Sequence, residues 1–77
     1  MKKFNISIAK RIDILRKNKG ISWEKLAYSS GISKGGLSEI KNGIVEPKLS
    51  TLYRMFAALE ITPKDFFDFE IDLTDFD

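Results

Sequence analysis

The side chains that most clearly indicate a chemical role in this 77-residue sequence are cationic, and they are concentrated in one part of the chain. Residues 1–59 hold twelve lysines and arginines against four acids, a balance of +8, whereas residues 60–77 hold one lysine against seven acids, a balance of −6. A strongly basic region attracts polyanions, and nucleic acid is the commonest of them. A solvated basic surface is the alternative that charge alone leaves open.

Catalytic and metal-binding chemistry has little support in the composition. The sequence has neither cysteine nor histidine, which removes disulfides, thiolate catalysis and most zinc sites. The carboxylates, lysines and tyrosines show no pair at a spacing that indicates an active site, so we predict that the chain is not an enzyme. The acidic tail lacks the glycine and ligand spacing of a calcium loop, so we expect no metal and no other cofactor.

Glycine and proline divide the chain into short segments whose apolar residues recur at helical spacing, which predicts an all-α domain. We expect five helices, at residues 8–19 after a Ser7 cap, 23–30, 33–42, 48–59, and from Thr62, where the sequence TPKD opens a short helix. The inward positions are Ile8, Ile12, Leu15, Leu26, Ala27, Leu37, Ile40, Leu49, Leu52, Phe56 and Leu59. Because Gly31 and Ser33 allow only a tight turn, the second and third helices form a helix-turn-helix by spacing.

The segment of residues 32–43 combines a helical apolar face with two glycines, Gly35 and Gly36, in its first turn. Each glycine costs a helix about 1 kcal/mol relative to alanine, so their presence needs a reason. Our interpretation is that glycine lets the end of this helix approach bases and phosphates closely. The alternative is that both glycines extend the preceding loop and that the helix begins near Leu37.

In this order, the features resemble the Cro and lambda-repressor (Xre-like) type of helix-turn-helix regulator. The resemblance covers about residues 8–67 and rests on Ile12, Leu15, Arg16, Gly20, Ile21, Ser22, Leu26, Ala27, Gly31, Ile32, Ser33, Leu37, Ile40, Asn42, Gly43, Pro47, Leu49, Leu52, Leu59 and Ile61. It implies a compact five-helix fold and a transcriptional regulator, either a repressor or an autoregulator. Such a protein binds double-stranded operator DNA, typically as a homodimer, with the helix of residues 33–42 in the major groove.

The resemblance also implies which positions contact DNA. Carried over by position, they are Trp23, Ser33, Lys34, Gly35, Ser38, Glu39, Lys41, Asn42, Gly43 and Lys48. Lys34 can donate to guanine and Glu39 can accept from cytosine, whereas Gly35 reads no base. Asn42 and the Gly43 amide match the phosphate contact after the helix, and the lysines at 41 and 48 add charge along the DNA backbone.

Two positions depart from the family pattern. Trp23 stands where the family often has a phosphate-binding glutamine; its indole N–H can donate one such bond, and covering the core is an equally good interpretation. Lys41 stands where the family often has a glutamate that pairs with the arginine matching Arg16. Because two cations repel, we expect Arg16 to face solvent, DNA or an acid of the tail.

The two ends of the chain show a second pattern. Every second residue is apolar from Phe67 to Leu73, and Phe4, Ile6 and Ile8 alternate in the same way. We predict that the fifth helix ends near Phe69 and that the termini pair in a short β-ribbon, within one chain or across a dimer. A helical stripe through the tail and a frayed, solvated tail are the alternatives.

Chain length and apolar content give the remaining expectations. Since 77 residues bury too little surface for two cores, we expect one domain over residues 1–77, with a helix-turn-helix core at about 8–67 and an acidic tail at 68–77. No apolar run reaches the roughly 18 residues of a membrane span, and the start lacks the core of a signal peptide. We therefore expect a cytoplasmic protein with no membrane partner, and the sequence shows no site for a small-molecule ligand.

A protein–protein interaction module is the alternative function, since the same fold could bind a partner through its helix-turn-helix face or its acidic, apolar tail. Within DNA binding, three roles stay open: a phage or mobile-element repressor, a restriction-modification controller and an antitoxin-like autoregulator. The salt dependence of DNA binding separates the two functional classes.

Overall fold

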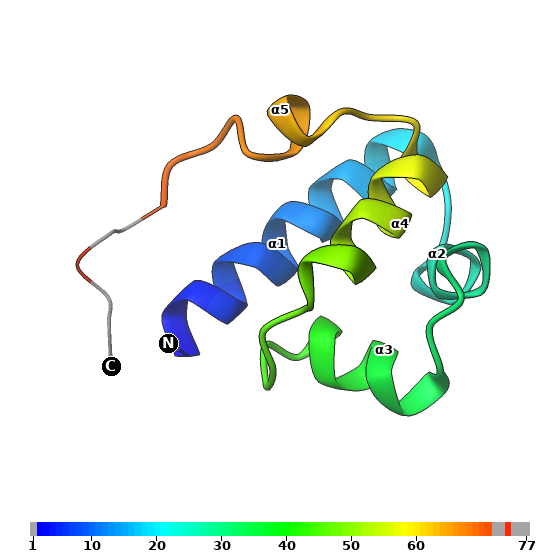
Figure 1. Ribbon diagram of the computed structural model, residues 1–77, viewed down its shortest axis with the longest axis horizontal. Helices are drawn as coiled ribbons and strands as arrows, with labels where there is room; N and C mark the ends of the chain where they lie inside the picture. Colours follow the sequence, from blue (N-terminus) through cyan, green and yellow to red (C-terminus); the bar gives the residue numbers. More distant parts are fainter. Residues whose placement is uncertain (1, 72–73, 75–77) are drawn as a thin grey trace.

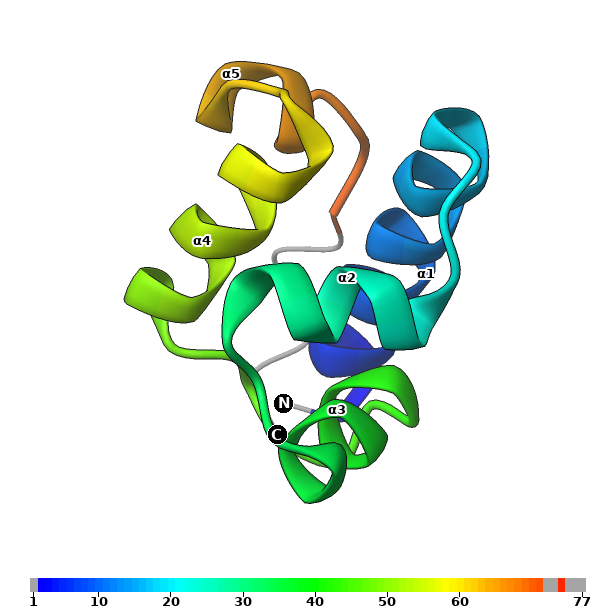
Figure 2. The ribbon, with the colours of Figure 1, turned by 90° about the vertical axis from the view of Figure 1, so that its right-hand side faces the viewer.

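The computed structural model describes residues 2–71 and 74, and over these residues it contains five helices and no strand. They are α1 (Lys2–Lys19), α2 (Trp23–Ser30), α3 (Lys34–Lys41), α4 (Leu49–Leu59) and α5 (Pro63–Phe66). The five-helix, all-α class expected from the sequence is therefore confirmed. Figure 2 shows α1 and α4 on opposite sides of α2, and both views show α3 at one end of the molecule and α5 at the other (Figures 1 and 2).

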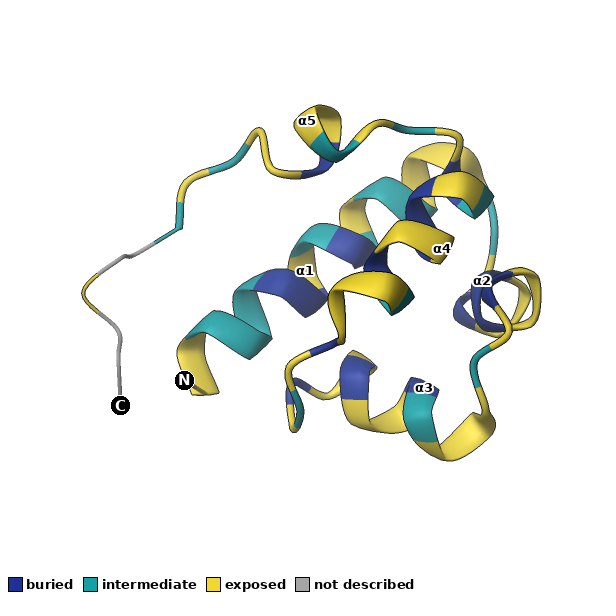
Figure 3. Ribbon diagram, viewed as in Figure 1, coloured by how far each residue is buried: buried dark blue, intermediate teal, exposed yellow. Residues whose placement is uncertain are grey.

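One apolar cluster joins the five helices. Its members include Ile8 and Ile12 of α1, Leu26 of α2, Leu37 and Ile40 of α3, Met55 and Phe56 of α4, and Phe66 of α5. Burying one such side chain contributes about 1.5–3 kcal/mol to stability. Because α3 is attached through only two of these side chains, most of its surface is left outside the core, as Figure 3 shows.

The core of α4 differs from the expected one at two positions. Leu49 was predicted to face inward, but it is 62% exposed, and Met55, which was not predicted, is fully buried. α4 begins at Leu49, so this residue lies in the first turn, at the edge of the cluster. The buried stripe is Leu52, Met55, Phe56 and Leu59, the usual helical spacing of three and four residues.

α1 begins at Lys2 and not at Ile8, so Ser7 lies inside the helix and is not its cap. Phe4 and Ile8 follow the four-residue spacing that leads to Ile12, and Phe4 packs against the core, which extends the helix towards the start of the chain. The prediction that Phe4, Ile6 and Ile8 form a strand of a β-ribbon is therefore wrong.

The fifth helix ends at Phe66, earlier than the predicted Phe69. Its capping box is formed as expected from the sequence: the Thr62 hydroxyl accepts from the Asp65 amide at 3.1 Å, and the Asp65 carboxylate accepts from the Thr62 amide at 3.2 Å. Residues 67–71 form no strand, and the remainder of the predicted ribbon, at residues 72–73 and 75–77, lies outside the described residues. None of the described helices combines the length and apolar character needed to cross a membrane.

The turn between α2 and α3 is as tight as the sequence predicts. Gly31 adopts the left-handed conformation, with φ of 68°, and its amide donates to the carbonyls of the last turn of α2. Ser33 then caps α3, with its hydroxyl accepting from the Gly36 amide at 3.1 Å. α3 begins at Lys34, so both Gly35 and Gly36 are helical and the alternative of a late start near Leu37 is wrong.

Candidate nucleic-acid interface

The outward face of α3 carries small and polar side chains. Leu37 and Ile40 face the core and are 7% and 5% exposed, whereas the helix residues that were predicted to face the bases of DNA are exposed. These are Lys34, Gly35, Ser38 and Glu39, whose one- and four-residue spacing places them on one side of the helix. The cap residue Ser33 is also exposed and precedes them directly. The structure thus brings five of the predicted site residues together on a single surface.

The two glycines of α3 have different surroundings. A Cβ added at Gly36 would lie 3.2 Å from both Ile32 Cγ2 and Ser33 Oγ, so glycine at this position lets the turn pack closely on the helix. A Cβ at Gly35 would meet nothing within 4 Å. Packing within the chain therefore explains Gly36 but gives no reason for Gly35, which lies on the exposed surface.

The end of α3 is fixed by hydrogen bonds and by contact with α1. Asn42 is exposed, and its side-chain amide donates to the Ser38 carbonyl oxygen at 2.8 Å. Gly43 is buried with φ of 68°, and its amide donates to the Ile40 carbonyl oxygen at 3.1 Å. A Cβ at Gly43 would lie 2.7 Å from Ile6 Cγ1, so only glycine lets the chain pass this close to α1.

Trp23 lies at the start of α2 and is 8% exposed. Its indole N–H donates to Asp13 Oδ1 at 3.1 Å, and the Arg16 guanidinium lies over its ring, 5.6 Å from the centroid. The indole therefore covers the core, which is one of the two roles that the sequence suggested for Trp23. Its N–H is already paired, so a phosphate would have to displace Asp13 to bind it.

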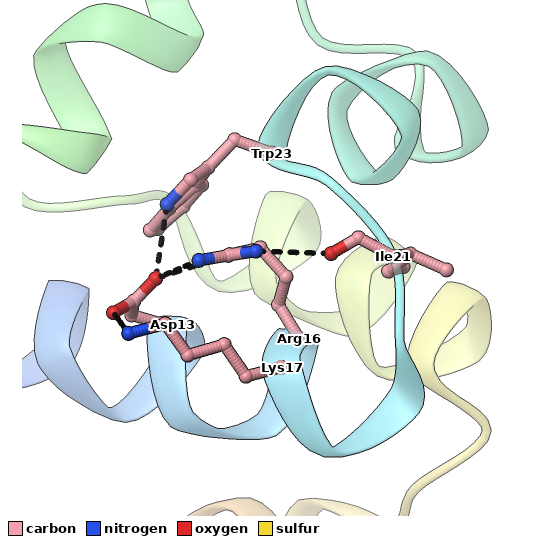
Figure 4. Close-up of polar contacts among 5 residues, drawn as sticks. All are labelled: Asp13, Arg16, Lys17, Ile21 and Trp23. Atoms are coloured by element: carbon pink, nitrogen blue, oxygen red, sulfur yellow. Dashed lines mark hydrogen bonds and ion pairs between the residues drawn. The ribbon is translucent and has the colours of Figure 1, made fainter.

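Arg16 connects α1 to the start of α2, as Figure 4 shows. Its Nε donates to Asp13 Oδ1 at 3.0 Å, its Nη2 pairs with the same oxygen, and its Nη1 donates to the Ile21 carbonyl oxygen at 3.1 Å. The expectation that Arg16 faces solvent, DNA or the tail is therefore wrong, because an acid one turn earlier on its own helix pairs with it.

Asp13 is the common acceptor of this cluster and was not singled out in the sequence. Lys17 Nζ also lies 3.0 Å from Asp13 Oδ2. Hydrogen bonds from Arg16 and Lys17 lower the pKa of the Asp13 carboxyl from 3.8 to about 2. The three- and four-residue spacing of Asp13 to Arg16 and Lys17 is the helical ion-pair spacing, and this signal could have identified the cluster.

Two hollows flank α3. The α1–α3 hollow, of about 620 Å³, lies between α1, the start of α2 and the end of α3, and its lining includes Lys10, Asp13, Arg16, Trp23, Lys41 and Asn42. The α3–α4 hollow, of about 500 Å³, lies between the helix-turn-helix turn and α4, and its lining includes Ser33, Gly36, Glu46, Lys48, Thr51 and Arg54. Cationic side chains therefore lie on both sides of the exposed face of α3.

Several cations in or near these hollows have no acidic partner among the described residues. Within residues 2–71, no ion pair involves Lys10, Lys34 or Lys41, nor Lys48 or Arg54. The sequence indicated Lys34, Lys41 and Lys48 but missed Lys10 and Arg54. Helical spacing alone does not show that α1 and α4 contribute side chains to the hollows beside α3.

Comparison with known proteins places this arrangement in a family. A family model described as helix-turn-helix (HTH_3) matches residues 12–66. The HTH-type transcriptional regulator SlrR of Bacillus subtilis (strain 168) is 39% identical over 64 residues, which cover 82% of this chain and 42% of SlrR. This chain therefore spans about two fifths of the length of that relative.

Among solved structures, the restriction-modification controller protein C.AhdI from Aeromonas hydrophila has a similar fold. The TM-score is 0.74 at 28% sequence identity, and the match covers 82% of this chain and 96% of C.AhdI. This match agrees with the five-helix fold expected from the sequence.

Proposed function

The chain belongs to the helix-turn-helix family, and from this premise we propose that it is a sequence-specific, DNA-binding transcriptional regulator that places α3 in the major groove. The observation that carries the proposal is the face of α3 formed by Lys34, Gly35, Ser38 and Glu39, which is exposed and has unpaired cations on both sides. The printed descriptions of SlrR and C.AhdI as regulator and controller support the same function.

The dimensions of B-DNA support this orientation. The major groove is about 12 Å wide and admits one α-helix, with a phosphate backbone along each edge. A helix inserted there needs base-contacting groups on its outward face and cations to either side, because phosphate contacts fix its orientation. In this chain the cations that line the two hollows come from α1, from the end of α3, from Lys48 just before α4 and from α4 itself.

We propose individual roles that follow the exposure of each side chain. Lys34, Ser38 and Glu39 read base edges, and Gly35 lets the helix approach them. Ser33, Lys41, Asn42 and Lys48 contact or attract the phosphate backbone, together with Arg54, which lines the α3–α4 hollow. Trp23 and Gly43, both buried, hold α1 and α3 in position.

We further propose that the chain acts as a homodimer on two half-sites, as regulators of this type do. Leu49 and Phe67 line the same hollow and are 62% and 42% exposed, and this exposed apolar surface supports a further protein contact there. We also propose a cytoplasmic location, which the match to a Bacillus subtilis regulator supports, because bacterial DNA lies in the cytoplasm.

Selection of bound sequences from a random duplex pool, followed by two lysine substitutions, tests this function. Lys34→Ala should weaken binding to the selected duplex more than binding to unrelated duplex, because Lys34 is assigned to a base. Lys48→Ala should weaken both equally and reduce the salt slope by about one per subunit, because Lys48 is assigned to a phosphate. Identical effects of the two substitutions on all duplexes would contradict the placement of α3, and symmetry in the selected sequences would report a dimer.

A further inference from the structure

We propose that Ile6, in the second turn of α1, is a positioning residue for DNA recognition, because it holds the end of α3 and keeps this helix in the orientation that base reading needs. The proposal rests on the proposed function and deepens it. It assigns a role to a part of α1 that lies outside residues 12–66, the range that the family model matches.

The contact between Ile6 and Gly43, the residue after the C-cap of α3, carries the argument. An added Cβ at Gly43 would lie 2.7 Å from Ile6 Cγ1, 3.2 Å from its Cα and 3.3 Å from its backbone nitrogen. Gly43 is buried and Ile6 is half-buried, and Figure 2 shows the beginning of α1 beside α3. The chain that leaves α3 therefore passes directly against α1 at Ile6.

The side chain of Ile6 contributes little to the apolar core. Among the described residues, the core cluster and the side chains packed against it include Phe4 and Ile8, two residues away on either side, but not Ile6. Ile6 instead lines the α1–α3 hollow together with Ala9 and Asn42. The element that this apolar side chain can position is therefore the end of α3.

α1 contacts the helix-turn-helix at both of its ends. Asp13 accepts from the Trp23 indole at the start of α2, and Ile6 lies against Gly43 just after α3. Asp13 and Ile6 are seven residues apart, which is about 10 Å along a helix. Two contacts this far apart on one helix restrain the tilt of the helix-turn-helix, whereas a single contact restrains only its position.

Base reading makes the tilt of α3 important. Leu37 and Ile40 attach α3 to the core, but they lie within one turn of each other, so the contact at Gly43 adds a restraint beyond them. Hydrogen bonds to base edges weaken steeply when distance or angle is wrong, whereas charge attraction to the DNA backbone falls off gradually with distance. Loss of the Ile6 side chain should therefore reduce discrimination between sequences more than the general attraction to DNA.

Ile6→Ala, with Ile14→Ala as the matched control, measures this role without any change of charge. Ile14 lies on the same helix, is 51% exposed and is not in the core cluster. Ile6→Ala should lower affinity for the selected duplex several-fold and leave both affinity for an unrelated duplex and its salt slope unchanged. Ile14→Ala should change none of these quantities. The conservative Ile6→Val, which keeps both γ carbons, should retain most of the discrimination.

Urea unfolding of Gly43→Ala in two backgrounds tests the contact itself. Ile6→Ala removes Cγ1, the atom that an added Cβ at position 43 would meet first. Gly43→Ala should therefore lower the urea midpoint less in the Ile6→Ala chain than in the native chain. The rescue should be partial, because the positive φ of 68° and the backbone of Ile6 remain. Equal shifts of the midpoint in both backgrounds would overturn the proposal.

The duplex measurements separate failure of this role from failure of the proposed function. If Ile6→Ala matches Ile14→Ala on both duplexes while Lys34→Ala still weakens the selected one, Ile6 does not position α3 and the proposed function stands. If Ile6→Ala weakens binding to both duplexes equally, Ile6 supports only the fold, and the positioning role is rejected. If the native chain prefers no duplex over another, the proposed function fails and the positioning role fails with it.

Discussion

Glycine has three separate roles in the twelve residues from Ile32 to Gly43, although the amino acid is the same. Gly36 makes room for Ile32 and Ser33, and Gly43 lets the chain pass Ile6 with a positive φ. Gly35 has nothing within 4 Å of an added Cβ, and it lies among the residues assigned to bases. We propose that the cost of glycine at position 35 is offset by the close approach of this surface to DNA.

Alanine substitutions at Gly35 and Gly43 separate these roles. Gly35→Ala should raise the free energy of unfolding by about 0.5–1 kcal/mol, because alanine is the better helix former, and should weaken DNA binding. Gly43→Ala should lower the free energy of unfolding by at least about 1 kcal/mol, because its Cβ would collide with Ile6 at a positive φ. Urea unfolding and duplex titration measure both effects; unchanged DNA affinity of Gly35→Ala would contradict the role given to Gly35.

At the scale of single residues, the sequence predicted local positions better than tertiary partners. The exposed face of α3 could be read from helical spacing, because Leu37 and Ile40 define which side is buried. The partner of Arg16 was missed because a family pattern was preferred to the local spacing of Asp13. The burial of Gly43 depends on α1 crossing the end of α3, which periodicity does not describe.

At the scale of elements, the Asp13 cluster fixes α1 to the beginning of the helix-turn-helix. Arg16 bonds to Asp13 on its own helix and to the Ile21 carbonyl oxygen in the connection to α2, and Trp23 at the start of α2 donates to the same acid. One ionised carboxylate therefore contributes to holding the start of α2 against α1. This dependence predicts a particular response to acid.

Asp13→Asn should destabilise the fold at neutral pH, and the difference from the native chain should disappear in acid. The pKa of Asp13 is lowered from 3.8 to about 2 in the folded state, so its contribution is complete above the unfolded value and is lost as the pH falls through the folded one. Thermal unfolding of both chains at about pH 7, 4 and 2 measures the difference. A difference that is the same at all three values would contradict the role of the ionised carboxylate.

The helices themselves were predicted well wherever a capping residue marks their start. α2 has the predicted bounds, α3 differs by one residue at each end, and Ser22, Ser33 and Thr62 cap their helices through side-chain oxygens. The start of α1 was wrong because Ser7 matched a cap by type although Phe4 continued the apolar stripe beyond it. A capping residue alone does not show at which of two possible positions a helix begins, because packing against the core decides between them.

At the scale of the whole molecule, the sequence separates a basic body from an acidic end. The body carries +8 over residues 1–59, and the acids from residue 60 onward reduce the net charge of the chain to +2. Arg11 holds the beginning of this acidic part, since its guanidinium donates to the Phe66 carbonyl oxygen at 2.8 Å and lies 5.4 Å from the Phe69 ring centroid. We expect the acids of this part of the chain to reduce the attraction of the basic body for DNA.

Truncation after Phe69 tests this electrostatic role. It removes four acids, at residues 70, 72, 75 and 77, and raises the net charge from +2 to +6, so binding to unrelated duplex should become tighter at fixed salt. Thermal stability should change little, because Phe66 and Phe69, which pack in or against the core, are kept. The matched control is the full chain with the same four acids changed to amides, which should bind equally tightly; unchanged affinity in both would remove this role from the tail.

The salt dependence of duplex binding by the full chain tests the central claim most directly. Neutralising phosphates with lysine and arginine releases counterions, so log affinity should fall linearly with log salt, with a slope of about −0.9 per phosphate contact. About four to eight contacts per dimer give an expected slope between roughly −4 and −7. A flat dependence, or no binding of any duplex at low salt by the folded chain, would contradict DNA binding and favour a protein–protein interaction module.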